Sequence, residues 1–452
     1  MSETRPDTPA PTPAKSRPVL PRLPIAYFAL AHACLALAAL ALVLRPASFT
    51  GFYYHPKMVA VVHLVTLGWI TASILGALYL VAPLAFRTPI EVRRLDVAAF
   101  VLFLLGATGI PSHFWIDELT GVAWSGLFLI LAFLRVGWVV LANLRDAPIP
   151  GFHRLGLGLA FGNILLAALA GTSLGINKFW PFLPGRQLDN VHGHAHLAAL
   201  GWGLMVILAV GYRLLPMLLP SAMPRGCGVW ASLLLLQAGA MGLFVTFHLG
   251  GRGLEVAAGL AVLGVLTFLD RLRWMLGHRK RPAKGLPRPE PGVVQVLLAM
   301  VCLLGASVLG LLLALRPTTT ETLRWCAVYG VLGLLGVFGQ LVAGVAFRLA
   351  PLYTWLRAFG RGGHKTPPPS PHGFGHLGLQ WTVVVAWATA VASLAVGLYF
   401  ESVVAVRVGG TALLLATGLG VVHHARVLRH LAGSEASSSA VGSEAGSAQT
   451  RR

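Results

Sequence analysis

The sequence predicts an all-α fold, a polytopic membrane helical bundle of about 12 transmembrane helices in three pseudo-symmetric four-helix units. Three observations predict this class. The chain of 452 residues is 56% hydrophobic and 11% charged, with a mean hydropathy of +0.74, a balance typical of membrane proteins. Its apolar runs are about as long as a bilayer is thick. One of these runs also recurs twice along the chain.

Each apolar run, bounded by charged or Pro/Gly-rich segments, predicts one membrane span. A helix needs about 20 apolar residues to cross the hydrocarbon core. A lipid-exposed backbone must satisfy its own hydrogen bonds, so the spans are helices; barrel strands would alternate over segments of about 10 residues. In chain order, the first unit (24–150) holds spans near 24–44, 58–84, 95–112 and 120–142; the second (151–290) near 155–173, 191–217, 229–248 and 254–270; the third (291–430) near 293–315, 325–352, 373–399 and 403–425.

The second span of each unit carries a repeated sequence. Residues 63–83, HLVTLGWITASILGALYLVAP, align without a gap to residues 196–216, HLAALGWGLMVILAVGYRLLP. The identities include a Gly-Trp pair and a tyrosine, which apolar composition alone does not explain. A third, weaker copy lies at 331–351, where Val331 takes the place of the histidine. The spacings of 133 and 135 residues indicate three units around a pseudo-threefold axis.

The two ends of the chain differ from residues 24–430, which we expect to form a single membrane domain. Residues 1–23 are polar and rich in proline, and residues 431–452 are of low complexity, so both are predicted to be disordered cytoplasmic tails. The four cysteines are scattered and form no CxxC or CxxCH motif. The sequence therefore offers no disulfide framework, zinc ribbon or covalent haem attachment.

The net charge of +20 would suit nucleic acid, but its distribution indicates membrane topology instead. With both termini in the cytoplasm, 26 Lys and Arg residues fall on the cytoplasmic side and 8 on the other, and Arg135 lies within a span. This bias follows the positive-inside rule. We therefore expect a multi-pass protein of the bacterial inner membrane, in contact with lipid and not with nucleic acid.

Histidines from separate spans are predicted to share one layer near the non-cytoplasmic surface. The stretch NVHGHAHLAALGW (190–202) begins the sixth span with three of them, and a fourth lies about five residues into the second span. At about 1.5 Å per residue, these lie within roughly 10 Å of that surface. A fifth ends the seventh span. Because imidazole commonly ligates haem iron and copper, we interpret the layer as cofactor-binding (His63, His194, His196) and metal-binding (His192, His248).

The remaining histidines favour less specific interpretations. A lone histidine in a span is often an interhelical hydrogen-bond partner, which is the expectation for His32 and His113. Those in basic segments or at cytoplasmic span ends are expected to be solvated, namely His153, His278, His364, His423, His424 and His430. The role of His372 and His376 stays open. The carboxylates, including Asp96, are expected at or near span ends.

The His194-x-His196 motif, followed by Leu-Gly-Trp and by a tyrosine and a proline that close the helix, carries a resemblance. It resembles the haem-binding helix of the haem–copper oxidase subunit I superfamily, especially its cbb-type oxidase and nitric oxide reductase branches. The plan of about twelve spans in three units is similar to this superfamily and to the haem- and copper-associated NnrS group. As architecture the resemblance covers most of the chain; as motif it covers about 25 residues and His63.

The resemblance implies one or two b-type haems, allows copper, and implies a cytochrome c or another redox subunit as a partner. Carried over to this chain, His63 and His196 would be the two axial ligands of a low-spin haem, and His194 would bind a second haem or metal. Two-histidine ligation leaves iron coordinatively full for electron transfer, whereas a single histidine leaves a position open for a gas. In the superfamily this helix is the tenth span; here it is the sixth.

Three functions stay open on these observations. The first is an integral membrane haem-binding protein of haem–copper oxidase subunit I-like fold that handles electrons or a diatomic gas, oxygen or nitric oxide. The second is a nitric oxide or oxygen reductase with a reduced metal site, an oxidoreductase for which no catalytic residue is predicted. The third is a metal-ion or proton transporter or channel. The chain contains no Walker or HExxH motif, so the sequence does not support nucleotide hydrolysis or zinc-protease chemistry of the soluble type.

Overall fold

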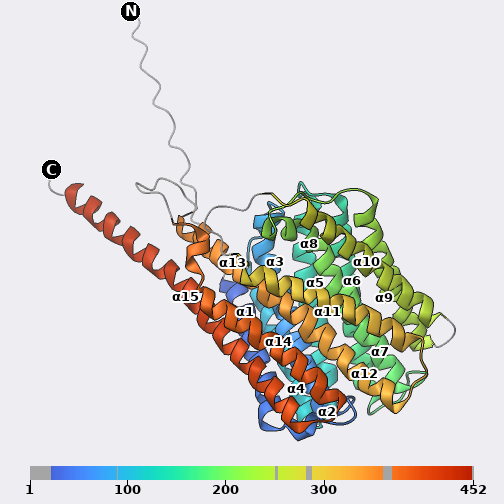
Figure 1. The fold of residues 1–452 in the computed structure, drawn as a ribbon. Helices are drawn as coiled ribbons and strands as arrows, with labels where there is room; N and C mark the ends of the chain where they lie inside the picture. The colour runs from blue at the N-terminus through green and yellow to red at the C-terminus, as the bar shows by residue number, and fades with distance from the viewer. Residues whose placement is uncertain (1–21, 89, 250–252, 281–287, 360–368, 450–452) are drawn as a thin grey trace, which may run out of the picture.

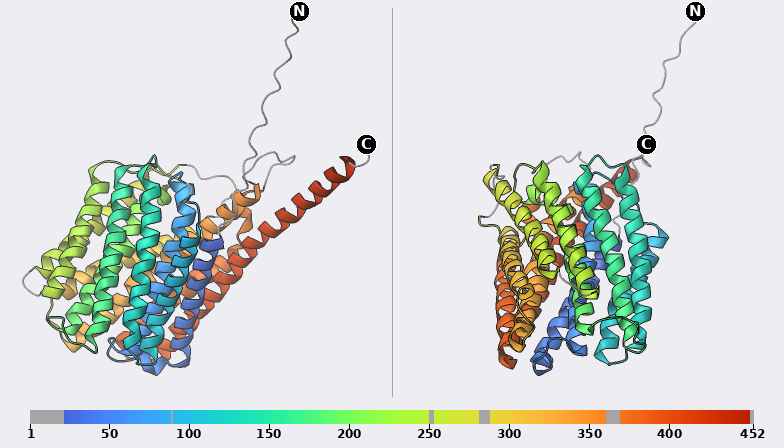
Figure 2. Two further views of the ribbon diagram at one scale, coloured as in Figure 1. Left: turned by 180° about the vertical axis from the view of Figure 1, so that it is seen from behind. Right: turned by 90° about the vertical axis from the view of Figure 1, so that its right-hand side faces the viewer.

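The computed structural model describes residues 22–88, 90–249, 253–280, 288–359 and 369–449, with side chains of the last helix described to His430. Within these ranges the chain consists of helices and loops without a β-strand (Figure 1). This confirms the all-α membrane bundle that the sequence predicts. Figure 2 shows from two further sides that the long helices run alongside one another.

Nine of the spans are single helices and three are composite. The single helices are α1 (Arg22–Leu44), α4 (Arg94–Trp115), α5 (Thr120–Arg145), α6 (Gly151–Asn177), α9 (Cys227–Leu249), α10 (Leu254–Gly277), α11 (Pro291–Ala314), α14 (Leu377–Tyr399) and α15 (Val403–Gln449). The composite helices are α2 (Pro56–His63) with η2 (Leu64–Thr71) and α3 (Ala72–Ala85), α7 (Gln187–His196) with η3 (Leu197–Leu204) and α8 (Met205–Leu218), and α12 (Thr320–Val331) with η4 (Leu332–Gly339) and α13 (Gln340–Phe359). Short 3₁₀ turns lie at η1 (Pro46–Phe49) and η5 (Pro371–Phe374).

Eleven of the described helices, each composite helix counted once, are long and apolar enough to cross a membrane. The twelfth long helix is α10, which packs along α9 and carries Glu255 near its start and Asp270 and Arg271 near its end. The described part of the chain therefore holds the twelve helices expected from the apolar runs.

The nine single helices surround the three composite ones. Each outer helix packs on the next, in the order α1, α4, α5, α6, α9, α10, α11, α14 and α15, and α15 packs back on α1. The apolar windows of the composite helices are 67, 72 and 61% buried, whereas no other span exceeds 50%. The repeated sequence thus forms the inner helices, and any group they carry lies inside the bundle.

The middle of each inner helix is a π-helix, and the three π segments occupy matching places in the repeat. They begin directly after His63, His196 and Val331, the positions that the sequence alignment pairs. A π-helix is rare and is often found at a functional site. A proline follows inside each inner helix, at Pro83, Pro216 and Pro351. The sequence repeat is therefore also a repeat of backbone conformation.

Glycines of the repeat allow outer helices to approach the π segments closely. A Cβ at Gly68 would lie 2.2 Å from the Cβ of Cys34 in α1, and one at Gly336 would lie 3.0 Å from the Cβ of Cys302 in α11. Cys34 and Cys302 are themselves equivalent in the repeat, because they are separated by the sum of the two unit spacings, 133 and 135 residues. The two helix contacts are thus equivalent, and each depends on the absence of a side chain.

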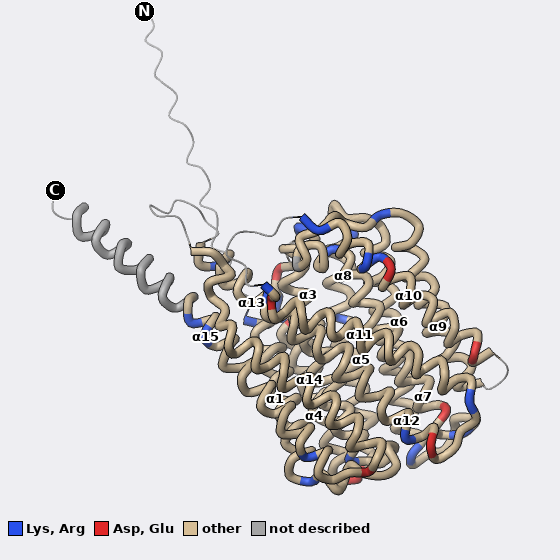
Figure 3. The backbone as a smooth tube through the Cα atoms, in the orientation of Figure 1, with Lys and Arg blue, Asp and Glu red and all other residues tan. Residues whose placement is uncertain are grey.

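The surface of the bundle suits lipid. Large apolar side chains point outward, among them Trp138 (71% exposed), Val301 (67%) and Val385 (63%). Most charged residues lie toward the two ends of the bundle, with an uncharged band between them (Figure 3). Asp96 lies in the first turn of α4, at a span end as expected. Its side chain is fully buried there and pairs with Arg135 of α5 at 2.9 Å.

We call the end of the bundle where α1 begins the terminal end, and the end where α2, α7 and α12 begin the histidine end. Residues 1–21 of the predicted N-terminal tail lie outside the described residues. At the other terminus, the low-complexity composition predicts disorder over 431–452, but α15 continues as a helix to Gln449.

Candidate functional site

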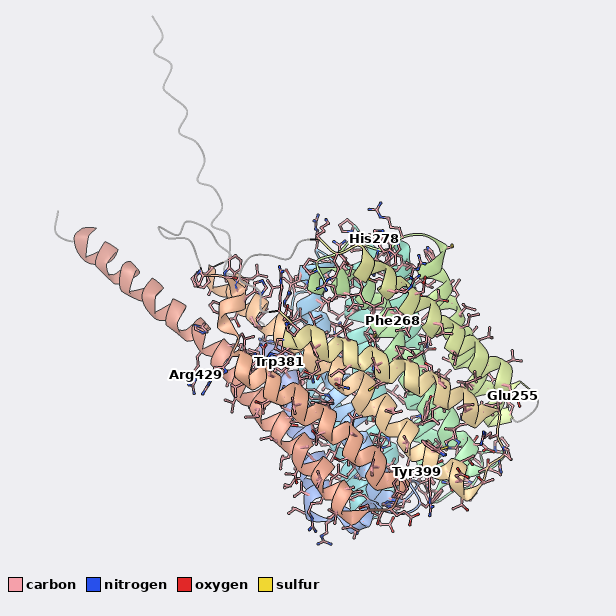
Figure 4. The ribbon with its side chains drawn as sticks, in the orientation of Figure 1. Glu255, Phe268, His278, Trp381, Tyr399 and Arg429 are labelled. Atoms are coloured by element: carbon pink, nitrogen blue, oxygen red, sulfur yellow. The ribbon has the colours of Figure 1, made fainter. Side chains whose placement is uncertain are left out.

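The five histidines singled out by the sequence lie at the histidine end of the bundle. His63 is the last residue of α2, His192, His194 and His196 lie in the last two turns of α7, and His248 lies at the end of α9. All five side chains are partly buried. Figure 4 labels Glu255 and Tyr399 at this end, and His278 at the opposite end of α10. The predicted layer is therefore present, built from three separate spans.

Four of these imidazoles use Nδ1 in the same way. The Nδ1 atoms of His63, His196 and His248 lie 2.8 Å from the backbone carbonyl four residues earlier, at Val59, His192 and Phe244. The Nδ1 of His194 lies 2.9 Å from the carbonyl of Ala167 in α6. A carbonyl only accepts, so each Nδ1 donates its proton. In the neutral imidazole, Nε2 is then an unprotonated lone-pair donor, as a metal ligand must be.

His194 and His63 lie near each other at the boundary of the first and second units. The ring of His194 packs against Gly171 of α6, where a Cβ would lie 2.8 Å from it, and interacts electrostatically with His63 and then with His248. The ring of His63 stacks on Phe114 of α4, with centroids 5.7 Å apart and planes at 14°. The first boundary thus holds two imidazoles and one aromatic ring.

His196 points to the boundary of the second and third units instead. Its ring stacks between Phe247 of α9, at 5.5 Å and 28°, and Tyr329 of α12, at 5.8 Å and 22°. His196 thus contacts aromatic rings of the second and third units, whereas His194 is the histidine of this helix that interacts electrostatically with His63; the resemblance implies a pair of His63 and His196. Residues two apart on a helix point about 200° away from each other, so only one of them can face His63.

The two sites are equivalent by the spacing of the units. His63 and Phe114 correspond to His196 and Phe247 at a spacing of 133, and His194 corresponds to Tyr329 at a spacing of 135. The first boundary therefore holds two histidines, and the second holds a histidine and a tyrosine. At the third boundary the corresponding residues are Val331 and Val61, both buried. The backbone is repeated, but the chemistry of the three boundaries is not.

His192 and His248, predicted as metal ligands, are placed differently. The Nε2 of His192 lies 2.7 Å from the hydroxyl of Tyr53, so this nitrogen already has a hydrogen-bond partner. The ring of His248 packs against Gly193, where a Cβ would lie 2.5 Å from its Nδ1. Among the described residues, no group of three or more His, Cys, Asp or Glu side chains is close enough to hold a metal ion. The arrangement thus offers no support for a copper centre here.

Sequence reasoning missed the aromatic residues of the site. Tyr53 lies in the loop before α2, and Phe114, Phe247 and Tyr329 lie on three different helices. The signal that could have found Tyr329 was the spacing of 135 residues from His194. Tyr53 had no such signal, because it lies 139 positions from His192, which is not the spacing between units of the repeat.

Several other histidines are not where the sequence suggested. His153 and His423, expected in solvent, are fully buried, and bond to the Ala209 carbonyl and to Gln380. His113 pairs with Glu118 just beyond its own helix, at 2.9 Å, and not across to another span. His376 caps α14 by accepting a hydrogen bond from the amide of Leu379.

The fold and the site together define a polytopic helical membrane protein with a layer of imidazoles at one end. No known family model matches the chain, and no curated protein is significantly similar to it.

Proposed function

We propose that the protein is a membrane haem-binding protein whose imidazoles ligate iron, and that it handles electrons or a diatomic gas. One observation carries this proposal: four histidines in one buried layer hold Nδ1 on backbone carbonyls and keep Nε2 as a lone-pair donor. This is the arrangement that orients histidine ligands toward a metal. Interhelical hydrogen bonding explains it less well, because Nε2 of these four residues has no hydrogen-bond partner among the described residues.

The donor set fits b-type haem in two different ways. His63 and His194 lie near each other and would both ligate one iron, which suits electron transfer. His196 faces a tyrosine instead and would supply one axial ligand, which leaves a position for oxygen or nitric oxide. When bound, haem would supply the redox chemistry, and the chain's own residues would set its surroundings.

The residues around the imidazoles position them and exclude water. The rings of Phe114 and Phe247 stack on His63 and His196 and restrict their rotation. The Ala167 carbonyl holds His194 in the tautomer that exposes Nε2 to the unit boundary. Each ligand is therefore oriented before iron binds, which reduces the entropy lost on binding.

The two alternatives have less support. A reductase of nitric oxide or oxygen needs a carboxylate near its metal, and Asp189, at the start of α7, pairs with Arg186 at 2.8 Å. A metal-ion transporter needs a cluster of ligands, and the described residues contain none. Among the described residues, no specific observation therefore supports either alternative.

The same proposal includes the orientation in the membrane. By the positive-inside rule both termini lie in the cytoplasm of a bacterial cell, which places the histidine end at the periplasmic face of the inner membrane. A cytochrome c or another redox subunit would reach the site there. A green fluorescent protein fused to the C-terminus should fluoresce, because it folds in the cytoplasm; a dark fusion of normal abundance would contradict this orientation.

A reduced-minus-oxidised absorbance spectrum of the purified protein tests the function. We expect a Soret band and one or two iron atoms per chain from cells supplied with haem. A colourless, correctly folded preparation from such cells would exclude both the haem-binding function and the reductase alternative, and would favour the transporter.

A further inference from the structure

A second candidate site lies in the terminal half of the bundle, away from the histidine layer. A cavity of about 730 Å³, partly open to the surface of the bundle, lies between α1, α3, α8, α13 and α15. It runs from the level of Ile70 and His32 to that of Pro24 and Leu428 near the terminal end. Its walls are almost wholly apolar, and its volume is that of a pocket for a small molecule.

Two imidazoles lie side by side on one wall of this cavity. His32 of α1 and His424 of α15 have ring centroids 5.5 Å apart, with planes at 76°. The Nδ1 of His32 donates to the Phe28 carbonyl at 2.7 Å, so its Nε2 is an acceptor. His424, expected in solvent, is instead inside the bundle, and neither of its nitrogens has a well-formed hydrogen bond. One of these nitrogens is a donor and the other an acceptor.

Other helices contribute unpartnered hydroxyl groups to the same cavity. The hydroxyls of Ser73 on α3 and Tyr353 on α13 are buried and have no hydrogen-bond partner among the described residues. Buried polar groups without partners cost free energy and are uncommon in native structures. The poorly bonded imidazole of His424 and these two hydroxyls, which all line one apolar cavity, therefore indicate a ligand that supplies their partners.

The cavity also restricts the class of ligand. No Lys, Arg, Asp or Glu lines it in the described part of the chain, so it lacks a counter-ion for a phosphate, a fatty-acid carboxylate or a haem propionate. The two histidines come from α1 and α15, which pack directly on each other, so they share one wall. Axial ligands of one haem must approach from opposite faces, which this arrangement does not provide.

The geometry points to a neutral isoprenoid quinone or quinol as the ligand of this cavity. One ring oxygen would bond to the imidazoles, with His424 donating to a carbonyl and the Nε2 of His32 accepting from a hydroxyl. The second ring oxygen would lie toward Ser73 or Tyr353, and the isoprenoid tail along the apolar walls. The site is a binding site, independent of the haem proposal, since it shares no residue with the histidine layer.

Binding of decylubiquinone to the full-length protein in detergent tests this inference. The indole of Trp69 lies 5.1 Å from the ring of His32, so bound quinone should quench tryptophan fluorescence. We expect saturable quenching at about one quinone per chain, and isoprenoid quinone in a solvent extract of the protein as purified. 1-Decanol, which has the tail without the ring, should not compete. Equal competition by decanol would show a non-specific apolar cavity and overturn the inference.

Two variants and a matched control sharpen the test. His424→Leu removes the unpartnered nitrogens, and Gly418→Phe fills the cavity from a position where a Cβ meets nothing within 4 Å. Both should weaken decylubiquinone binding at least about tenfold. Gly420→Phe, at a glycine that is equally open but does not line the cavity, should bind as the parent protein does. Unchanged binding in both test variants would overturn the inference, whether or not the protein contains haem.

Discussion

The histidines of this protein differ in what their two ring nitrogens contact. Four histidines of the layer hold Nδ1 on a carbonyl and present Nε2, whereas the fifth, His192, presents Nε2 to Tyr53, and His424 leaves both nitrogens without a good partner. Sequence position does not reveal this difference, because all of them lie in or beside apolar helices. The contacts of the individual rings therefore separate ligands from structural residues.

The proposed haem function predicts which histidines would share one iron. His63→Ala and His194→Ala should each abolish the same low-spin absorbance, because the two imidazoles lie near each other and interact electrostatically. His196→Ala should leave that signal in place, because its ring lies between Phe247 and Tyr329. Absorbance and electron paramagnetic resonance spectra measure this, with His278→Ala at the opposite end as the control. Loss of the signal in His196→Ala but not in His194→Ala would restore the pairing implied by the sequence.

The first turn of α2 should depend on pH through His55. This residue caps the helix by accepting the amide N–H of Met58 at 3.4 Å, which requires an unprotonated Nδ1. Burial, and then the charge of Lys57, lower the pKa of His55 below its usual value. The folded state thus prefers the neutral ring, and stability is lost as the pH falls below about 6.5, the usual histidine pKa.

Hydrogen exchange at the Met58 amide, corrected for the intrinsic rate, should therefore show more opening at pH 5.5 than at pH 7.5. His55→Asn keeps an acceptor without titrating in this range, so it should remove the pH dependence. The same dependence in His55→Asn would show that another group is responsible.

At the scale of the helices, the three π segments are the most regular feature. Each begins one residue after the paired positions of the repeat, and each is crossed closely by an outer helix of its own unit. The apolar pattern predicted the spans in which they lie. It could not predict the π conformation, because an apolar run in lipid has the same composition in either kind of helix.

Adding a methyl group at one close contact should destabilise the bundle. In Gly68→Ala the new Cβ would overlap Cys34, and we expect a loss of about 1–3 kcal/mol, seen as a lower melting temperature in detergent. Gly333→Ala, in the third π segment but with nothing within 4 Å, is the matched control and should change little. Cys34→Gly in the Gly68→Ala background should restore part of the loss. Equal melting temperatures for the two alanine variants would show that α1 does not pack as described.

At the scale of the whole molecule, a repeated backbone carries different chemistry at each boundary. Two imidazoles lie near each other at the first, an imidazole and a phenol stack at the second, and two valines are the equivalent residues at the third. The quinone cavity lies between α1, α3, α8, α13 and α15 in the terminal half of the bundle, away from the histidine layer. The repeat thus provides three equivalent boundaries between units, and the different residues at those boundaries give each one a different chemistry.

The repeat predicts that a second two-histidine site can be created. Tyr329→His should place an imidazole opposite His196 in the position that His194 has opposite His63. We expect an increased low-spin signal per chain, without loss of the first site. Val331→His, which lacks an equivalent partner at Val61, should not add such a signal. An unchanged spectrum in Tyr329→His would contradict the equivalence of the two boundaries as ligand sites.

By itself, the sequence determined the helical class, the twelve spans, their threefold repeat and the shared depth of the histidines. These properties depend on the length, composition and spacing of local segments, which a bilayer converts directly into helices and depths. The tertiary structure alone decided that His194 lies near His63, that Arg135 pairs with a buried Asp96, and that His32 and His424 line one cavity. Those facts depend on the rotation of each helix about its axis and on contacts between residues far apart in the chain, which packing determines.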